Sequence, residues 1–519
     1  MSRCVYLTFL LLAAVLSFSL PAFAQVRTFY VSPSGLDTNA GTETAPWKTI
    51  QKAFTSATPG STVLVRSGIY NEKPTVNVSG TATAGYITFQ NYPNEQPVID
   101  GTGRSGENIV TIRNRNYIKL IGFEIRNNLN VNFGAGIWVE GGCDRIELRS
   151  NRIHEMRGTE AIGIGVYGTS STKSISNLLI YGNEVYDSDP AESEALTLNG
   201  NVELFQVINN YVHDVNNIGI DFIGGEKTCP LASKDAARNG VCRGNIVRRA
   251  RSNYGGGYAG GIYVDGGRDI TIEQNTVSES DIGIEIGAEN RGLVTSGVIV
   301  RNNLIYNNDK IGLAFGGYDS TRGRVRNCKF LNNTLYNNNS LAGAGLTDVS
   351  RCEIFIQYAD TNTVMNNIIY GSSNNRLLLG ASVRNSSTQN NTINYNLWFV
   401  SGGSTQARFY WNGRFLTGFT AYRAATTQDK NSISVDPLFV NPALASLNLH
   451  LLSTSPAINA GIARTEVTTD FDNIPRPQGG KYDIGAFEFF TALKPESHSD
   501  EITPELIPQD GLENSDTDR

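Results

Sequence analysis

Three acidic residues, Asp221, Asp265 and Glu285, lie in short segments of the same pattern, in which apolar residues alternate with polar or small ones. The segments read GIDFIGGE from residue 219, GIYVDGG from residue 261 and GIEIGAE from residue 283. This alternation predicts strands with one buried face. Their inward positions carry Ile220, Ile262 and Ile284. The acids therefore take the outward phase, and we expect them to face solvent on one sheet within about 10 Å of each other.

A carboxyl cluster of this kind suits two chemistries on polysaccharides. An inverting glycosidase uses two carboxyl groups about 6.5–9.5 Å apart, one as general acid and one as general base. A uronate lyase uses carboxylates to hold Ca²⁺, which neutralises the substrate carboxylate while a base removes the α-proton. In the lyase, Asp221, Asp265 and Glu285 are the expected Ca²⁺ ligands; otherwise we expect no cofactor. Acidic residues are also common on ordinary surfaces, which is the third interpretation.

Insertions at residues 225–241 and 251–260 flank the acidic segments and are predicted to wall a groove over them. Aromatic rings suit the apolar faces of sugars, and basic side chains suit a charged polymer. The candidate substrate-binding residues are Tyr254, Tyr258, Tyr263, Arg268 and Lys310. Further cations close by are Lys227 and Arg243, and further acids in the adjoining turns are Glu226 and Glu289.

A repeated Asn indicates which elements position these residues. It follows a short apolar strand every 27 to 35 residues, as in GNEVYDS, NNYVHDV and NNTLYNN. The repeated positions are Asn151, Asn183, Asn210, Asn245, Asn275, Asn303, Asn333 and Asn367. A period of this length predicts a solenoid whose coils each hold three short strands. Because Asn tolerates left-handed backbone and its amides can bond along a stack, we expect one axial column of these residues.

An aromatic residue or His follows three positions after most of these Asn residues. His213 stands there beside Asp214, which resembles a catalytic pair. Tyr occupies the same place in most coils, so His213 is interpreted as one rung of a stack.

The composition and the N-terminal sequence limit the partners and the cellular compartment that we expect. A formal charge of -6 argues against nucleic acid as a partner. Residues 1–24 have a basic start, an apolar run and the sequence AFA, which predicts a signal peptide cleaved near Ala24. We therefore expect a secreted, periplasmic or cell-surface protein, monomeric and without a membrane span in the mature chain. In such an oxidising compartment, Cys229 and Cys242 are predicted to form a disulfide, and Cys328 and Cys352 are candidates for a second one.

The two ends carry resemblances to known families. YVSPSG, TAPWKTIQKAF and PGSTVLVRSGIY resemble the N-terminal cap of secreted β-helix proteins that include family-nine pectate lyases. Residues 127–391 resemble the repeats of the pectin-lyase-like superfamily. DPLFVNPALASLNLHLLSTSPAINAGI and DFDNIPRPQGGKYDIGAFEF, within residues 436–489, resemble the choice-of-anchor Q region. No residue roles are transferred from these families.

Together these observations predict an all-β chain: a single right-handed parallel β-helix of about ten coils with an N-terminal capping helix near residues 49–57. The expected segments are a signal peptide (1–24), an N-terminal cap (26–70), the β-helix (71–400), a C-terminal cap with the choice-of-anchor Q-like region (401–490) and a disordered acidic tail (491–519). The leading functional hypothesis is a polysaccharide lyase that cleaves a uronate polymer by β-elimination. The alternatives are an inverting glycoside hydrolase with paired carboxylates and a non-catalytic surface or adhesion protein.

Overall fold

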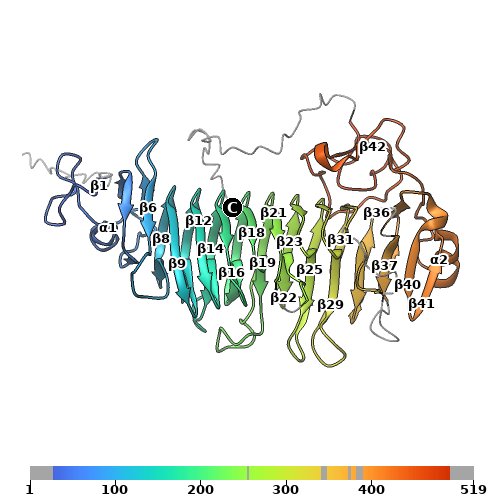
Figure 1. Cartoon of the computed structure of the whole chain (residues 1–519), viewed down its shortest axis with the longest axis horizontal. Helices are drawn as coiled ribbons and strands as arrows, with labels where there is room; N and C mark the ends of the chain where they lie inside the picture. Colours follow the sequence, from blue (N-terminus) through green and yellow to red (C-terminus); the bar gives the residue numbers. More distant parts are fainter. Residues whose placement is uncertain are drawn as a thin grey trace, which may run out of the picture.

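The computed structural model describes residues 27–253, 256–339, 348–371, 374, 376–381 and 390–490. The predicted signal peptide, Tyr254 and the acidic tail lie outside the described residues. The described chain forms an elongated parallel β-solenoid of about 11 turns, which confirms the predicted fold class (Figure 1). Within this described part, no helix is long and apolar enough to cross a bilayer.

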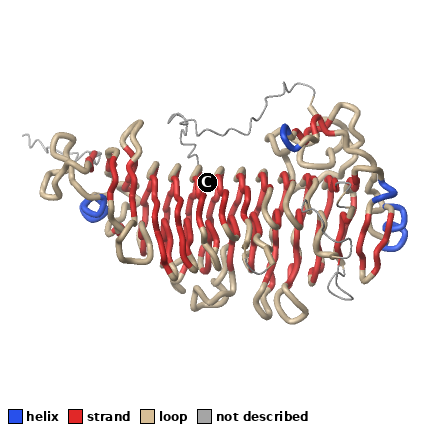
Figure 2. The backbone as a smooth tube through the Cα atoms, viewed as in Figure 1, coloured by secondary structure: helices blue, strands red, loops and turns tan. Residues whose placement is uncertain are grey.

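Three long sheets run along the solenoid, and each strand pairs with the strand one coil further on (Figure 2). The 16-stranded sheet contains β1 (Thr28–Val31), β2 (Thr62–Val65), β5 (Ile87–Asn91), β8 (Asn116–Ile121), β11 (Asp144–Arg149), β14 (Ile175–Tyr181), β17 (Val202–Ile208), β20 (Arg238–Arg243), β23 (Arg268–Glu273), β27 (Ile299–Arg301), β31 (Lys329–Leu331), β35 (Thr363–Met365) and β38 (Thr392–Asn394), with β26 (Val294–Ser296), β30 (Arg324–Arg326) and β34 (Ala359–Asp360) at its side.

The 13-stranded sheet contains β4 (Thr75–Val76), β7 (Val110–Arg113), β10 (Gly134–Glu140), β13 (Ala161–Gly168), β16 (Glu194–Gly200), β19 (Ile218–Ile223), β22 (Gly260–Asp265), β25 (Ile282–Ala288), β29 (Ile311–Gly317), β33 (Ile354–Gln357), β37 (Leu377–Ala381), β40 (Arg408–Trp411) and β41 (Arg414–Thr417). The 12-stranded sheet contains β3 (Gly68–Tyr70), β6 (Pro97–Asp100), β9 (Glu124–Val131), β12 (Arg152–Gly158), β15 (Glu184–Ser188), β18 (Tyr211–Val215), β21 (Ile246–Ala250), β24 (Thr276–Ser278), β28 (Leu304–Tyr306), β32 (Thr334–Tyr336), β36 (Ile368–Gly371) and β39 (Leu397–Val400).

Strand pairing inside the solenoid is parallel, and inward side chains of equal phase stack in columns. Ile220 pairs with Ile262 and Ile262 with Ile284, and all three side chains are fully buried. Among the described strands, only β40–β41 and the separate pair β42 (Phe439–Asn441) and β43 (Asn448–Leu451) are antiparallel. The alternation seen in the sequence thus gives one apolar interior shared by all coils.

The predicted Asn column is present and buried. Each side chain donates from Nδ2 to Oδ1 of the Asn in the next coil at 2.9–3.0 Å. The same Oδ1 accepts the backbone N–H of the preceding Asn, and Nδ2 also donates to a carbonyl one coil back, as Asn245 does to Val207. The column continues one coil beyond the prediction, to Asn396. Every polar atom of these side chains is therefore satisfied without water.

A second, shorter ladder was not predicted. Asn308 donates to Asn338, and Asn338 donates from its backbone N and its Nδ2 to the two carboxyl oxygens of Glu353 at 2.9 and 2.7 Å. Glu353 is fully buried, and burial raises the pKa of its carboxyl group to about 8. This ladder therefore ends on an acid that keeps its proton at neutral pH.

The aromatic column on the 12-stranded sheet confirms the structural interpretation of His213. Its ring stacks on Tyr186 at 5.3 Å, and Tyr186 stacks on His154 at 4.8 Å. His213 also contacts Asp214 and Glu184. These residues lie on a different sheet from the acidic strands.

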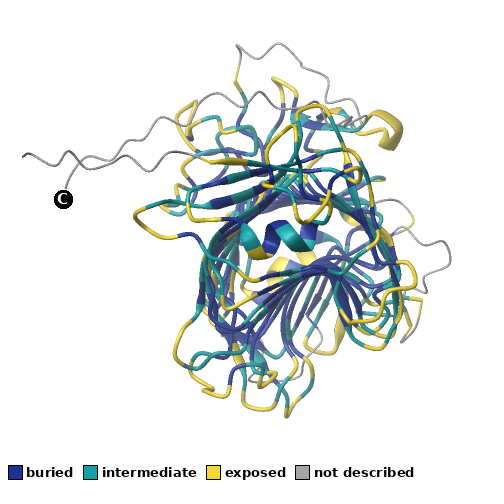
Figure 3. Cartoon of the chain, turned by 90° about the vertical axis from the view of Figure 1, so that its left-hand side faces the viewer, coloured by how far each residue is buried: buried dark blue, intermediate teal, exposed yellow. Residues whose placement is uncertain are grey.

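Helix α1 (Ile50–Ser56) lies across the N-terminal end of the solenoid, inside the ring of strands in Figure 3. Its buried residues Ile50, Ala53 and Phe54 join the main core. Thr49 caps the helix by accepting from the backbone N of Lys52, and the Glu72 carboxylate accepts the N–H groups of the first turn at 2.8 and 2.9 Å. The helix closely matches the predicted range of 49–57.

At the other end, helix α2 (Phe419–Thr426) packs on the last coil, where the rings of Tyr422 and Phe409 stack at 4.2 Å. The chain then turns back, and residues 431–490 pack along the side of the solenoid beside β28, β32 and β36 (Figure 1). The residue just before a ladder Asn holds this module: Gln274, Asn302, Asn332 and Asn366 each donate to one of its backbone carbonyls.

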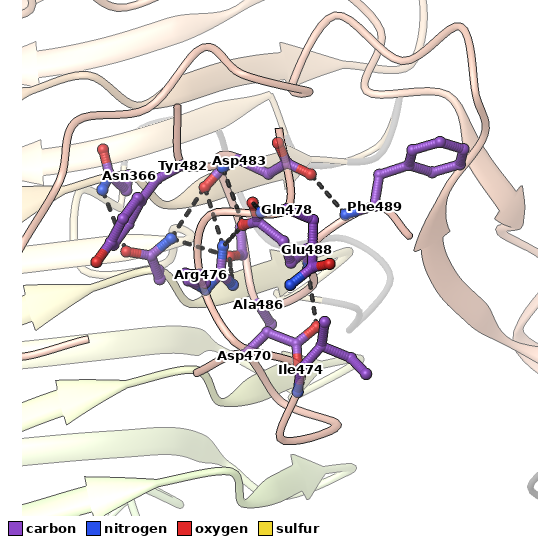
Figure 4. A network of polar contacts seen from close by, with 12 residues as sticks. Asn366, Asp470, Ile474, Arg476, Gln478, Tyr482, Asp483, Ala486, Glu488 and Phe489 are labelled. Atoms are coloured by element: carbon purple, nitrogen blue, oxygen red, sulfur yellow. Dashed lines mark hydrogen bonds and ion pairs between the residues drawn. The ribbon is translucent and has the colours of Figure 1, made fainter. Parts of the chain in front are cut away.

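A buried ion pair organises the module of residues 431–490 (Figure 4). Arg476 and Glu488 are 2.7 Å apart, and neither side chain is exposed. Arg476 also donates to the carbonyls of Asp483 and Gly485, and Asp470 accepts the backbone N–H groups of Ile474 and Glu488. The charged residues of the DFDNIPRPQGGKYDIGAFEF motif thus serve its own folding.

The predicted disulfide is wrong, because the five described cysteines are all free and buried. Cys242 lies at an inward position of β20, with its Sγ 3.3 Å from Nδ2 of Asn245. Cys229 lies in a loop, with its Sγ 3.7 Å from the carbonyl of Ser170. Cys328 and Cys352 are likewise unlinked. The two thiols of the predicted pair face different partners, which sequence spacing could not reveal.

The ladder predicts a specific stability loss. Replacing Asn245 by Ala removes the hydrogen-bond partners of Asn210 and Asn275 inside the core, so we expect the free energy of unfolding to fall by about 1–3 kcal/mol. Urea denaturation measures this, with Asn132→Ala, at an exposed position, as the control. Equal stability of the two variants would contradict a stabilising ladder.

The raised pKa of Glu353 predicts that the stability of the fold depends on pH. Its pKa is raised from 4.5 to about 8, so its contribution to stability is full below about pH 4.5 and is lost as the pH rises through 8. Glu353→Gln keeps an acceptor for Asn338 but cannot ionise. We expect the melting temperature of the variant, relative to the parent, to be higher at pH 9 than at pH 5. A difference that does not change with pH would contradict this account.

Candidate active site

The structure brings the three predicted acids together on the outer face of the 13-stranded sheet. Asp221 lies on β19, Asp265 on β22 and Glu285 on β25, which are consecutive strands of that sheet. Asp221 pairs with Tyr263 and Tyr263 with Glu285, so these residues form one axial column. Asp265 is two residues further along, opposite Gly287.

The expectation that the acids face solvent is wrong for two of them. Asp221 is 2% exposed and Asp265 is 8% exposed, and only Glu285 is partly open. Side chains from neighbouring segments lie over two glycines of this face. A Cβ on Gly266 would be 2.4 Å from Leu293, and a Cβ on Gly287 would be 2.7 Å from the Tyr263 hydroxyl. Glycine at these two positions allows the sheet face to be covered.

Glu194, on the neighbouring strand β16, joins the cluster and was missed. It lies two residues before the inward Leu196, so simple alternation assigns it to the interior. It is instead the first residue of its strand, where the chain turns a corner of the coil, and Oγ of Ser193 donates to it at 3.1 Å. No signal in the sequence marks this change of direction.

Two acids from the adjoining turns complete the group. The backbone N–H of Glu289 donates to Oδ1 of Asp265 at 2.9 Å, and the hydroxyl of Tyr263 donates to Oε1 of Glu289 at 3.1 Å. Nδ2 of Asn290 donates to Glu226 at 2.5 Å. Tyr263 thus lies within the acidic cluster, with its hydroxyl bonded to an acid, and its role in substrate binding stays a prediction.

The pKa values of the buried acids are raised. Burial is the largest cause in each case, and repulsion from neighbouring carboxylates adds to it. The pKa of Asp265 is raised to about 7 and that of Glu285 to about 8, and after burial the charge of Glu289 is the largest cause for both. The pKa of Glu194 is raised to about 7, and that of Asp221 is raised well above its ordinary value.

The charged neighbours that raise these pKa values are all acidic. Asp221 is affected by Glu194, Asp265 and Glu289, and Asp265 by Glu289, Glu226 and Glu194. Among the described residues, no basic group is a cause of these shifts, so burial and repulsion favour the protonated forms near neutral pH. A set of carboxyl groups divided between protonated and ionised forms can perform general acid and general base chemistry.

The predicted basic residues are engaged outside the cluster. Arg268 is on β23 of the 16-stranded sheet and donates to the carbonyl of Ser233 at 2.8 Å, and Arg243 on β20 is 3.7 Å from Glu273. Lys310 donates to the carbonyls of Gly256 and Gly257 and lies 3.9 Å from the ring centre of Tyr258. It therefore contacts residues 256–258 of the insertion.

The arrangement of the acids decides whether they could hold Ca²⁺ in this conformation. Across the described ranges, no group of three or more His, Cys, Asp or Glu side chains is placed so that it could hold a metal ion. Asp221, Asp265 and Glu285 share one face but do not have metal-ligand spacing. In this conformation, the acids fit proton transfer better than metal coordination.

The chain belongs to the family described as "Pel9A-like, right handed beta helix region", whose model matches residues 29–339. The parallel solenoid is accordingly a right-handed β-helix.

Particular relatives differ in how much of the chain they match. YwoF of Bacillus subtilis (strain 168) is 36% identical over 476 residues, which cover 86% of this chain and 98% of YwoF. Pectate lyase PEL9 of Emericella nidulans is 47% identical over 76 residues, 14% of this chain and 18% of that enzyme. A structure of XylC with xylose has the same fold, with a TM-score of 0.52 and 11% identity over 89% of this chain and 98% of XylC.

The raised pKa of Asp265 predicts that its charge destabilises the fold. Its stabilising contribution is full below about pH 3.8 and is lost as the pH rises through about 7. Asp265→Asn keeps the acceptor for Glu289 N–H and removes the charge. We expect this variant to melt at a higher temperature than the parent at pH 8, with a smaller gain at pH 5. The control is Asp269→Asn at an exposed position of β23. A lower melting temperature for Asp265→Asn at pH 8 would refute the prediction.

Proposed function

We propose that this protein hydrolyses glycosidic bonds of a neutral polysaccharide at the acidic cluster, with Asp265 and Glu285 as the catalytic pair. The observation that carries the proposal is the set of buried carboxyl groups with raised pKa values and only acidic neighbours. The carboxyl groups of such a site repel a polyuronate once they ionise, whereas an uncharged sugar meets no electrostatic barrier.

The strand geometry supports an inverting course. Asp265 and Glu285 lie on adjacent strands, about 4.8 Å apart, and are offset by two residues, about 6.6 Å, along the strand. Their Cα atoms are therefore about 8 Å apart. Inverting glycosidases have carboxyl groups about 6.5–9.5 Å apart, which leaves room for the attacking water.

The surroundings of the two acids support a role for each. Glu285, whose pKa is raised by burial, donates its proton to the glycosidic oxygen as the bond to the anomeric carbon breaks. The Asp265 carboxylate, held by the N–H of Glu289, accepts a proton from the attacking water, whose oxygen forms the new bond. Activity should fall at low pH as Asp265 is protonated and at high pH as Glu285 loses its proton.

A uronate lyase is the second candidate, supported by the Pel9A-like family and the 76-residue match to pectate lyase PEL9. It requires a cation to offset the substrate carboxylate, and Asp221, Asp265 and Glu285 would have to move closer together to bind Ca²⁺. The predicted signal peptide is consistent with either enzyme acting outside the cytoplasm on an extracellular polymer.

Product analysis separates the candidates. With xylan, glucan, mannan, pectate and alginate as substrates, we expect reducing ends from a neutral polymer, no ultraviolet-absorbing unsaturated ends, and no effect of EDTA. Xylan is included because XylC was solved with xylose. Asp265→Asn and Glu285→Gln should each lower turnover at least about 100-fold, in line with loss of a general acid or base. Asp269→Asn is the matched control and should retain full activity.

Unsaturated products that disappear with EDTA would establish the lyase instead. Absence of either product from all five polymers would favour the non-catalytic surface protein. Full activity of both active-site variants would show that the acidic cluster is not the catalytic site.

A further inference from the structure

The sheet face next to the acids carries buried polar atoms that lack partners. Seven buried side-chain N or O atoms in the described chain have no hydrogen bond of ordinary geometry. Three of them are neighbours here: Oγ1 of Thr197, Oδ1 of Asn199 and Oδ1 of Asp221. Thr197 pairs directly with Asp221, and Asn199 is two residues along the same strand.

These atoms belong to side chains on the outer face of the sheet, and they are nevertheless buried. Thr197 is fully buried, Asp221 is 2% exposed and Asn199 is 5% exposed, yet all three lie at outward positions of strands β16 and β19. Buried polar groups in native proteins are nearly always paired, so three orphans on two adjacent strands indicate a missing partner. That partner must offer several hydrogen-bonding groups at short spacing.

A cluster of aromatic side chains adjoins these atoms on the preceding strands, in which Trp138 is buried and Phe133 and Tyr167 are partly buried. Tyr167 on β13 pairs with Asn199, and its ring stacks on Trp138 of β10 with centroids 4.3 Å apart. Trp138 lies flat over Gly165, where a Cβ would be 2.6 Å from the indole, and Gly165 pairs with Thr197. Phe133 packs edge-on against both rings. The rings and the polar atoms thus form one continuous face beside Asp221.

We infer that this face, formed by Trp138, Tyr167, Thr197, Asn199 and Asp221, binds an uncharged pyranose ring of the substrate next to the catalytic pair. A pyranose presents an apolar C–H face that suits an aromatic ring and a rim of hydroxyl groups that donate and accept hydrogen bonds. The orphan oxygens supply acceptors for those hydroxyls. The inference rests on the proposed function, for which it names the substrate class.

The test removes one oxygen of this face. Thr197→Val replaces the hydroxyl, which also lowers the pKa of the Glu194 carboxyl, by a methyl group of the same shape. In a background of Glu285→Gln, which prevents turnover, we expect calorimetry to show binding of cellohexaose, xylohexaose or mannohexaose that is weakened at least tenfold by Thr197→Val. Thr197→Ser, which keeps the hydroxyl, should retain the affinity.

Thr111→Val is the matched control, because Thr111 is in the same column, beyond Trp138, and outside the proposed subsite. It should bind as the parent does. The inference is overturned if none of the three neutral hexasaccharides binds, or if Thr197→Val binds them as tightly as the parent does. It is supported independently of catalysis if binding behaves as expected but no polymer is hydrolysed, in which case only the proposed function fails. Preferential binding of hexagalacturonate would also overturn it.

Discussion

The hydrogen bond from one buried Asn amide to the next sets the register on which the rest of the molecule depends. Because each link joins Oδ1 to both the backbone and the side chain of its neighbour, successive coils cannot slip by a residue without losing two bonds at every rung. The ladder lies inside the solenoid, so loops between coils can vary in length without disturbing it. Residues far apart in the chain, such as Asp221 and Glu285, are thereby held at fixed spacing on one face.

That fixed spacing allows the protein to keep like charges together. Neighbouring carboxyl groups on adjacent strands would normally destabilise a sheet. Here burial removes hydration from the acids and raises the pKa values of Asp265 to about 7 and of Glu285 to about 8. Burial thus lowers the stability at alkaline pH and, by the same effect, supplies a proton donor at neutral pH. Unpaired polar atoms at Thr197 and Asn199 extend this local instability along the same face.

Features with a strict period could be predicted from the sequence. The Asn column, the stacking of His213 and the outward phase of Asp221, Asp265 and Glu285 all follow from local alternation repeated coil by coil. Features that depend on contacts between coils could not be predicted from the sequence. The burial of Asp221, the membership of Glu194 and the separation of the Cys229 and Cys242 thiols are decided by corners and loops, where the chain changes direction and periodicity ends.

The central claim is that the cluster holds a proton at neutral pH, and infrared difference spectroscopy of the carboxyl groups tests it most directly. The account predicts a protonated-carboxyl band at pH 6 that disappears by pH 9, with a component that is missing from Glu285→Gln and shifted in its pH midpoint by Asp265→Asn. Glu353→Gln identifies the separate signal of the ladder acid. A parent spectrum in which Glu285→Gln removes no protonated-carboxyl signal at pH 6 would show that Glu285 is ionised, and would contradict the account.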